Sequence, residues 1–292
     1  MQKVTFDPNL AYDDGKGGLR ILIPSAEGYI NYNFVHSVVP ERQCDMWRLS
    51  VTNALDTEEN HIVQLTKEYA EWEMAIRLDD RPDFIGGFNH GDEVFDQLTL
   101  SLDGNPFAPE EHTTAHEFDR MEITVTSTGF DPSHPEIAVL RHRKHYIFAK
   151  DGITLHQTVR WLGDYSLSKT CGSYLAMMPP VKFAGDPART ITDSYQFSAA
   201  TPTPIEAFPI ECSDTREITV SGRESGYRFT MRVEDYQPLY PNRYYALLTD
   251  NGGGNYNKMY FIFAGKSDDS VHTDTLWQST THYSIQKSNS SH

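Results

Sequence analysis

A short polar turn holds the first residues of this chain that could do chemistry. Residues 84–93 (FIGGFNHGDE) join two strand-like runs and place Asn89 and His90 at the tip of a glycine-bearing turn. A histidine at such a tip can act as a base, a metal ligand or a partner for a carboxylate. The alternative is a structural β-turn whose Asn and Asp side chains hydrogen-bond their own backbone.

A second segment, residues 252–261 (GGGNYNKMYF), opens from a glycine run into a predicted strand. Because alternate side chains of a strand share one face, Tyr256, Lys258 and Tyr260 are expected to stand in a row. A lysine between two tyrosines can lower the pKa of a phenol and make it a usable proton carrier. Tyr244 is expected on an adjacent strand as a substrate-binding residue. The alternative is an amphipathic strand with ordinary aromatic packing.

Residues 141–146 (RHRKHY) form a basic run in an otherwise acidic chain. On a strand, Arg141, Arg143 and His145 share one face, and the intervening residues share the other. Arginine binds carboxylates with two parallel hydrogen bonds, so this strand could hold an acidic sugar. The alternative is a solvated sheet edge protected by charge. The sequence leaves open which face turns inward.

Composition limits the partners of the protein. The 292 residues contain 25 Lys and Arg and 41 Asp and Glu, for a formal net charge of −16. That acidity argues against nucleic acid and anionic membranes as partners, and a polyanionic ligand would need a local basic patch. Cys44, Cys171 and Cys212 match no zinc spacing and are expected to be free thiols. The first residues have no apolar signal-peptide region. The compartment is therefore secreted or periplasmic only if a signal was removed, and cytoplasmic otherwise.

The sequence predicts an all-β fold. Short runs with 16 Tyr and 15 Phe recur between turn signals, which is typical of an antiparallel β-sandwich or jelly roll with a concave carbohydrate-binding face. One domain is expected over residues 1–285, followed by a disordered polar tail, 286–292. A short helix is expected within 57–70, and long loops at 105–116 and 179–209. Strands are expected at 19–23, 47–52, 72–78, 94–102, 121–127, 137–148, 154–161, 218–220, 228–233, 244–249, 258–263 and 273–285.

The acidic pair Glu71 and Glu73 could serve a glycosidase. On a strand the two would share a face, and Trp72 and Met74 indicate that this face is an ordinary outward side. No nucleophile elbow, zinc helix or phosphate-binding loop is present. No metal or cofactor is expected; calcium could use the Asp-rich loops, but nothing in the chain demands it.

The run Tyr256-Asn257-Lys258-Met259-Tyr260 resembles the tyrosine–x–lysine strand motif of jelly-roll polysaccharide lyases, including the alginate-lyase and heparinase-like groups. The chain lacks the glutamine that usually closes the motif. The resemblance implies β-elimination at a uronic acid, with a neutralised carboxylate, a Tyr or His base and an acid for the leaving oxygen. The all-β length and aromatic richness also resemble the mutarotase-like supersandwich, whose members use a histidine and a carboxylate on sugars.

The function predicted from these observations is a lyase that cleaves a uronic-acid-containing polysaccharide or oligosaccharide. Asn89 with Arg141 or Arg143 would hold the carboxylate, and Lys258 would tune the acid. The base would be His90 or His145, and the acid Tyr256 or Tyr260. The alternatives are a mutarotase-like epimerase, a glycoside hydrolase, or a non-catalytic carbohydrate-binding or structural module. Oligomeric state is not readable from the sequence.

Overall fold

The computed structural model describes residues 1–10, 12–13, 15–68, 71–79, 81–108, 114–198, 200–240, 244–251 and 256–288. The side chains of residues 12, 13, 251 and 256 lie outside that description. The elements are β-strands apart from one 3-10 turn, η1 (Pro40–Arg42). The described residues include no helix long and apolar enough to cross a membrane.

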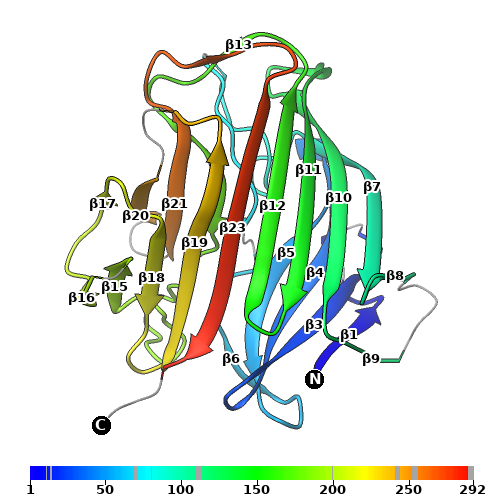
Figure 1. The fold of residues 1–292 in the computed structure, drawn as a ribbon, viewed down its shortest axis with the longest axis vertical. Coiled ribbons are helices and arrows are strands. Elements are labelled where there is room, and N and C mark those ends of the chain that lie inside the picture. Colours follow the sequence, from blue (N-terminus) through cyan, green and yellow to red (C-terminus); the bar gives the residue numbers. More distant parts are fainter. Residues whose placement is uncertain are drawn as a thin grey trace.

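One long antiparallel sheet, here the front sheet, runs across the whole molecule (Figure 1). It follows the order β7, β10, β11, β12, β23, β19, β18, β15, β16, with β8 beside β7. Its strands are β7 (Glu93–Leu102), β8 (Asn105–Pro106), β10 (Met121–Asp131), β11 (His134–Ala149), β12 (Gly152–Trp161), β15 (Ser194–Phe197), β16 (Thr203–Pro204), β18 (Glu217–Ser221), β19 (Tyr227–Gln237) and β23 (Leu276–Lys287).

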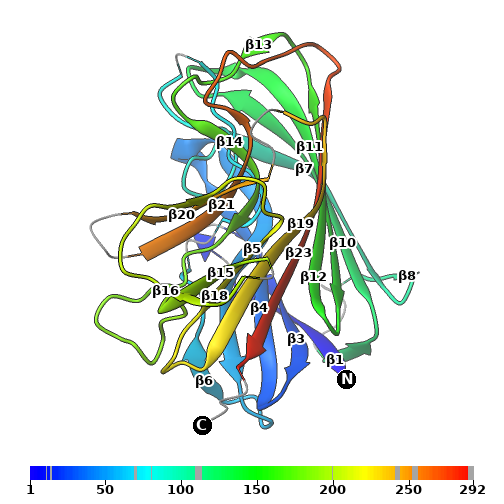
Figure 2. The same cartoon turned by 60° about the vertical axis from the view of Figure 1, so that its left-hand side comes forward.

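Two smaller sheets cover the inner face of the front sheet (Figure 2), and a parallel pairing of β5 with β7 joins the first of them to the front sheet. The second sheet has the order β9, β1, β3, β4, β5, β6, with β2 parallel to β4. Its strands are β1 (Gln2–Asp7), β2 (Tyr12–Asp13), β3 (Gly18–Ser25), β4 (Gly28–Val39), β5 (Cys44–Leu55), β6 (His61–Gln64) and β9 (His116–Phe118). The third sheet consists, in order, of β14 (Gly172–Met178), β21 (Tyr256–Gly265), β20 (Tyr245–Asn251) and β17 (Ile210–Cys212). A separate pair joins β13 (Tyr165–Ser166) to β22 (Ser270–Val271).

Aromatic side chains hold each covering sheet to a different half of the front sheet. Phe34 of β4 packs edge-on against Tyr146 of β11, with ring centroids 5.2 Å apart. Phe263 of β21 packs on Trp277 of β23 at 4.8 Å. Large buried rings supply much of the hydrophobic stabilisation of such interfaces. The seam between the two covering sheets is filled by the connection from β6 to β7.

That connection, residues 65–92, positions the site described below. Its Trp72 is fully buried and packs on Tyr32 of the second sheet and on Tyr283 of the front sheet, at 6.3 and 5.4 Å. Its Ala75 exchanges two backbone hydrogen bonds with Tyr174 of β14, at 3.1 and 2.8 Å. The connection is therefore attached to all three sheets.

The structure confirms the predicted fold class, and the strands expected at 137–148 and 154–161 form a hairpin in which Ala149 pairs with Gly152 across the turn. The helix expected within 57–70 is wrong, since His61–Gln64 pair with β5 as β6. The strand expected at 72–78 is also wrong, because this segment makes only isolated bridges. β23 continues through Lys287, so the first two residues of the expected tail pair with β19. All three cysteines are free thiols, as expected.

Candidate functional site

A buried ion pair joins the β6–β7 connection to the third sheet. The Lys258 ammonium on β21 donates to Glu71 Oε2 at 2.6 Å, and the Asn89 backbone N–H donates to Glu71 Oε1 at 2.8 Å. Glu71 is 1% and Lys258 6% exposed. Burial alone would raise the pKa of Glu71, but the charges of Lys258 and His90 and the two hydrogen bonds bring it below its usual range. Glu71 is therefore a carboxylate at neutral pH.

Glycines allow the polar turn to approach that carboxylate. Gly87 adopts φ +78°, and a Cβ added there would lie 2.6 Å from Glu71 Oε1. Gly91 adopts φ +81°, and its Cβ would meet the Arg42 carbonyl oxygen at 2.1 Å. Both positions need a residue without a side chain. The glycines predicted to shape this turn thus bring the N–H of Asn89 onto Glu71.

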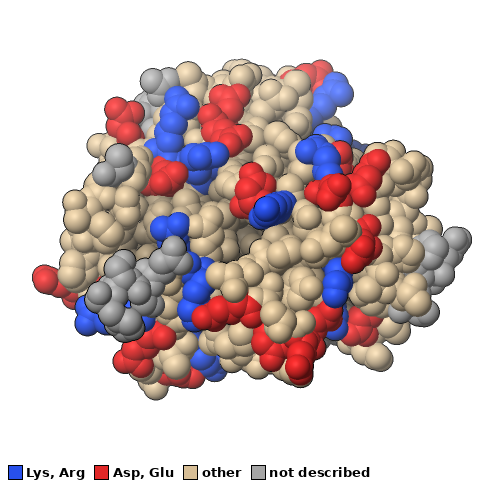
Figure 3. Space-filling view, turned by 60° about the horizontal axis from the view of Figure 1, so that its bottom comes forward, with Lys and Arg blue, Asp and Glu red and all other residues tan. Residues whose placement is uncertain are grey.

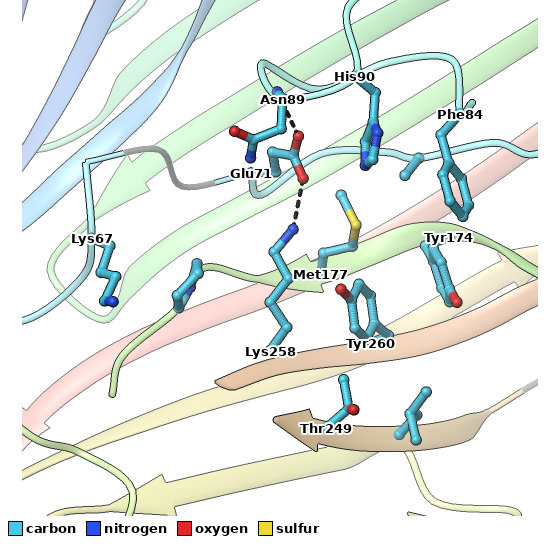
Figure 4. A pocket seen from close by; sticks show the side chains of 13 residues that line it. Lys67, Glu71, Phe84, Asn89, His90, Tyr174, Met177, Thr249, Lys258 and Tyr260 are labelled. Atoms are coloured by element: carbon cyan, nitrogen blue, oxygen red, sulfur yellow. Dashed lines mark hydrogen bonds and ion pairs between the residues drawn. The ribbon is translucent and has the colours of Figure 1, made fainter. Parts of the chain in front are cut away.

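His90 lies next to Asn89 and is oriented by a carboxylate. Its Nδ1 donates to Asp83 Oδ1 at 2.7 Å, and the same oxygen accepts the Phe84 backbone N–H at 2.7 Å. The Phe84 ring packs against the imidazole with centroids 4.9 Å apart. Because Nδ1 faces Asp83, Nε2 is the nitrogen presented to a ligand. Figure 4 shows the ring of His90 pointing into the pocket beside Glu71.

Aromatic side chains line one side of the pocket. Tyr260 of β21 and Tyr174 of β14 have ring centroids 4.5 Å apart, and Tyr174 stacks on Phe84 at 6.2 Å. Burial, with a smaller contribution from Tyr260, raises the pKa of Tyr174 well above its usual value. Tyr174 therefore stays a neutral hydroxyl. Lys258 Nζ lies 5.7 Å from the Tyr260 ring centroid, a cation–π distance.

Together these groups enclose a cavity of about 660 Å³. Its described lining residues are Lys67, Glu71, Ala75, Phe84, Asn89, His90, Tyr174, Met177, Pro180, Leu247, Thr249, Lys258 and Tyr260. That size suits a small molecule rather than a polymer segment, since small-molecule pockets span about 300–1,000 Å³. An ionised carboxylate, an oriented imidazole and an ammonium therefore line one cavity beside aromatic rings.

The structure brings together four of the residues predicted from sequence. Asn89, His90, Lys258 and Tyr260 all line this cavity, and the two that belong to β21 share one face as the alternation requires. The side chain of Tyr256 lies outside the described residues. Their roles in chemistry stay predictions.

The basic strand lies elsewhere. Arg141 and Arg143 are exposed on the outer face of β11, and Arg141 pairs with Asp96 at 2.9 Å. His145 shares that outer face, where its Nε2 meets Glu122 at 2.7 Å and its ring stacks on His156. The inward face of β11 instead holds the intervening residues His142, Lys144 and Tyr146. None of Arg141, Arg143 and His145 lines the cavity, so the expected convergence of three segments is wrong for this one.

Tyr244 does not line the cavity either. It is 5% exposed, stacks on Tyr236 with centroids 5.7 Å apart, and carries the Arg216 guanidinium 4.3 Å above its ring. Its φ of +56° turns the chain just before β20 and directs the side chain into the core instead of the pocket. The expected position beside the Lys258 row is corrected accordingly.

Sequence reasoning missed Glu71 and Asp83, the two carboxylates that organise the site. Glu71 was expected to face outward, yet it and Glu73 are both buried. Glu73 accepts a 2.5 Å hydrogen bond from Tyr146 of the front sheet. Local sequence gave no signal for this, because acids that alternate with Trp72 also fit the outward side of an amphipathic strand. Asp83 had no signal beyond its place before the glycine turn.

No metal site accompanies these groups. Within the described ranges, no cluster of three or more His, Cys, Asp or Glu side chains is arranged to hold a metal ion.

Comparisons with known proteins place the chain by overall shape only. No protein-family profile matches it, and no curated protein matches it. Among solved structures, a galactose mutarotase-like protein from Clostridium acetobutylicum shares 9% identity at TM-score 0.49, covering 97% of this chain and 98% of that one. Galactose 1-epimerase from Lactobacillus acidophilus shares 8% at TM-score 0.46, covering 99% and 100%. The galactosidase domain of an α-galactosidase–sucrose kinase shares 9% at 0.46, and the match spans 97% of this chain but only 42% of that one.

The geometry corrects the predicted function. Arg141 and Arg143, expected to neutralise a uronate carboxylate, lie on the outer face of β11. The lysine expected to tune a tyrosine is instead paired with Glu71. The prediction of a β-eliminating lyase is therefore wrong.

Proposed function

We propose that this protein is a carbohydrate-binding enzyme that interconverts the anomers of a monosaccharide, the epimerase alternative named from the sequence. The observation behind the proposal is the facing arrangement of Glu71 and the Asp83–His90 pair in one cavity. The rings of Tyr174 and Tyr260 supply the apolar surface on which the C–H face of a sugar packs.

The proposed reaction uses one proton acceptor and one proton donor. The Glu71 carboxylate takes the proton of the anomeric hydroxyl while protonated His90 gives its Nε2 proton to the ring oxygen. The bond between the anomeric carbon and the ring oxygen breaks, and an open-chain aldehyde forms. Rotation about the adjacent carbon–carbon bond and the reverse proton transfers close the ring as the other anomer.

The neighbouring groups have supporting roles in this scheme. The Lys258 ammonium keeps Glu71 ionised until it takes the proton, and Asp83 holds the imidazole in place through its hydrogen bond to Nδ1. Asp83 is a positioning residue because it reaches the pocket only through His90. Glycoside hydrolysis is less well supported, since it needs two carboxylates. Glu71 is the one carboxylate among the described lining residues.

The test is the approach of freshly dissolved single anomers to equilibrium, followed by optical rotation. The panel contains neutral hexoses and acidic saccharides, because the sequence predicted an acidic ligand. We expect the protein to exceed the spontaneous rate for at least one sugar, and His90→Gln to lose about 100-fold of that rate. His145→Gln, on the outer face of β11, is the matched control and should keep it.

Two results would overturn the proposal. One is folded protein that leaves the rate of every sugar at its spontaneous value. The other is equal activity in His90→Gln and the wild type.

A further inference from the structure

Two cations meet over one aromatic ring beside the cavity. Lys67, which lines the cavity, holds its Nζ 5.9 Å from the Phe183 ring centroid, and the Arg189 guanidinium carbon lies 4.0 Å from the same centroid. The backbone N–H of Lys67 donates to the Pro180 carbonyl oxygen at 3.0 Å, which fixes the lysine against the cavity wall. Arg189 is held by a 2.8 Å hydrogen bond from Nη2 to Gln64 Oε1, and its Nε lies 3.8 Å from Asp186 Oδ2.

Lys67 gives the described lining of the cavity an excess of positive charge, opposite in sign to the charge of the whole protein, and Arg189 lies behind it outside that lining. The described lining contains two ammonium groups, Lys67 and Lys258, and one carboxylate, Glu71, in a chain of net charge −16. Seen from its lower end, the molecule is hollowed near the centre, and basic and acidic side chains alternate around the hollow (Figure 3). Partial burial and the charge of Arg189 lower the pKa of Lys67. An anion bound beside Lys67 would favour its charged form.

The cavity is polarised along its length. In Figure 4, Lys67 lies on the side of Lys258 away from Tyr174 and Phe84, while Glu71 and His90 lie between the two ends. A sugar ring resting on the tyrosines would direct a substituent toward Lys67. Arginine and lysine are the side chains that bind carboxylate and phosphate oxygens most strongly.

We propose that the cavity takes an anionic monosaccharide, whose carboxylate or phosphate lies beside Lys67 and Arg189 while its ring packs on Tyr174 and Tyr260. This inference rests on the proposed function for the position of the reacting carbon. The two cations select the substrate and take no part in the proton transfers.

Binding and turnover are measured with four probes: a neutral hexose, the corresponding hexose phosphate, the corresponding uronate, and inorganic phosphate as a competitor. Wild-type protein should bind one anionic sugar at least about tenfold more tightly than the neutral hexose. The tighter of the phosphate and the uronate identifies the anion. Lys67→Met should raise the KM for that anionic sugar about tenfold, a larger rise than it causes for the neutral hexose.

Arg189→Gln is the second variant and should act in the same direction. Lys169→Met, which removes an exposed lysine paired with Asp268, is the control and should change nothing. The inference is overturned if the variants weaken the binding of the anionic and the neutral sugar equally. It is also overturned if neither variant changes the preference for the anionic sugar, or if no anionic probe binds. It fails separately from the proposed function. Turnover of neutral hexoses without selectivity for anions would overturn only the inference of an anionic substrate. Calorimetric binding of an anionic sugar without turnover would overturn only the proposed enzymatic function.

Discussion

Two lysine–glutamate pairs are buried in the described part of this protein, and they differ in their surroundings. Lys144 Nζ lies 2.8 Å from Glu93 Oε1 with both side chains fully enclosed, and Lys258 Nζ lies 2.6 Å from Glu71 Oε2 at the wall of a cavity. Glu93 also accepts hydrogen bonds from His142 Nδ1 at 3.2 Å and from Ser127 Oγ at 2.5 Å.

The two lysine–glutamate pairs thus differ in what can reach them. Around Glu93, three protein donors converge on one oxygen between packed strands, and their attraction outweighs burial to depress the pKa of Glu93 strongly. No ligand can reach that carboxylate. The Glu71–Lys258 pair borders the pocket on one side. A ligand there can therefore replace part of the hydrogen bonding that Glu71 makes within the protein. Burial of a charge does not by itself identify a functional site; contact with a cavity does.

The largest expected effect comes from breaking the enclosed pair. Lys144→Met should lower the free energy of unfolding by about 3–5 kcal/mol, because it leaves the Glu93 charge buried without its main partner. Urea denaturation followed by tryptophan fluorescence measures this. A loss below about 1 kcal/mol would show that Glu93 takes up a proton or water at little cost.

The equivalent change at the cavity should act on catalysis. Lys258→Met is expected to reduce kcat/KM for anomer interconversion about 100-fold, since Glu71 loses the charge that keeps it ionised. Its unfolding free energy should fall less than that of Lys144→Met, because water in the cavity can solvate Glu71. Equal stability losses in the two variants would remove the distinction between the pairs.

A third substitution tests the backbone conformation beside Glu71. Gly87→Ala should destabilise the protein by about 1–2 kcal/mol from its left-handed φ alone, and further by displacing Glu71. Gly104→Ala is the matched control, because its φ is +81° and a Cβ there meets nothing within 4 Å. Thermal melts and turnover of both variants separate the two contributions. Activity should fall only in Gly87→Ala.

The smallest expected effect concerns Asp92, between the glycine turn and Glu93. Burial, with the charges of Asp83 and Asp131, raises the pKa of Asp92 from 3.8 to about 6. The folded state therefore holds this proton more tightly than the unfolded state, and the resulting stability is lost as pH rises through about 6. Asp92→Asn should raise the unfolding free energy at about pH 8 by about 1 kcal/mol, allowing for solvent screening. Below pH 3.8 the same substitution should change the unfolding free energy little. No difference between the two pH values would contradict this.

Alternation and turn chemistry made much of this fold predictable. The period-two pattern of 258–263 fixed which side chains share a face of β21, and the Lys150–Gly152 turn marked the β11–β12 hairpin. The pattern gives no direction, however. It could not show that Lys144 points into the core and Arg143 into solvent, because that depends on which sheet covers β11.

Only part of the site was predictable, because local pattern does not show which side chains are brought together by long-range contacts. Asn89 and His90 stood out because a glycine turn signals an exposed tip. Glu71 did not, because 71–78 has strand-like composition but no strand partner over most of its length. Its environment is set by three sheets that meet around Trp72, and that is long-range information absent from local sequence.

The span of the Glu71–Lys258 contact has a consequence for synthesis. Its two residues are 187 positions apart, whereas Glu93 and Lys144 are separated by 51. A chain emerging from the ribosome can complete the enclosed pair while more than a third of its length is still to be made. It cannot assemble the pocket until β21 has been translated. Contacts of such long range are the slow ones in folding, so we expect Glu71 to acquire its counter-ion Lys258 late, after Glu93 has already paired with Lys144.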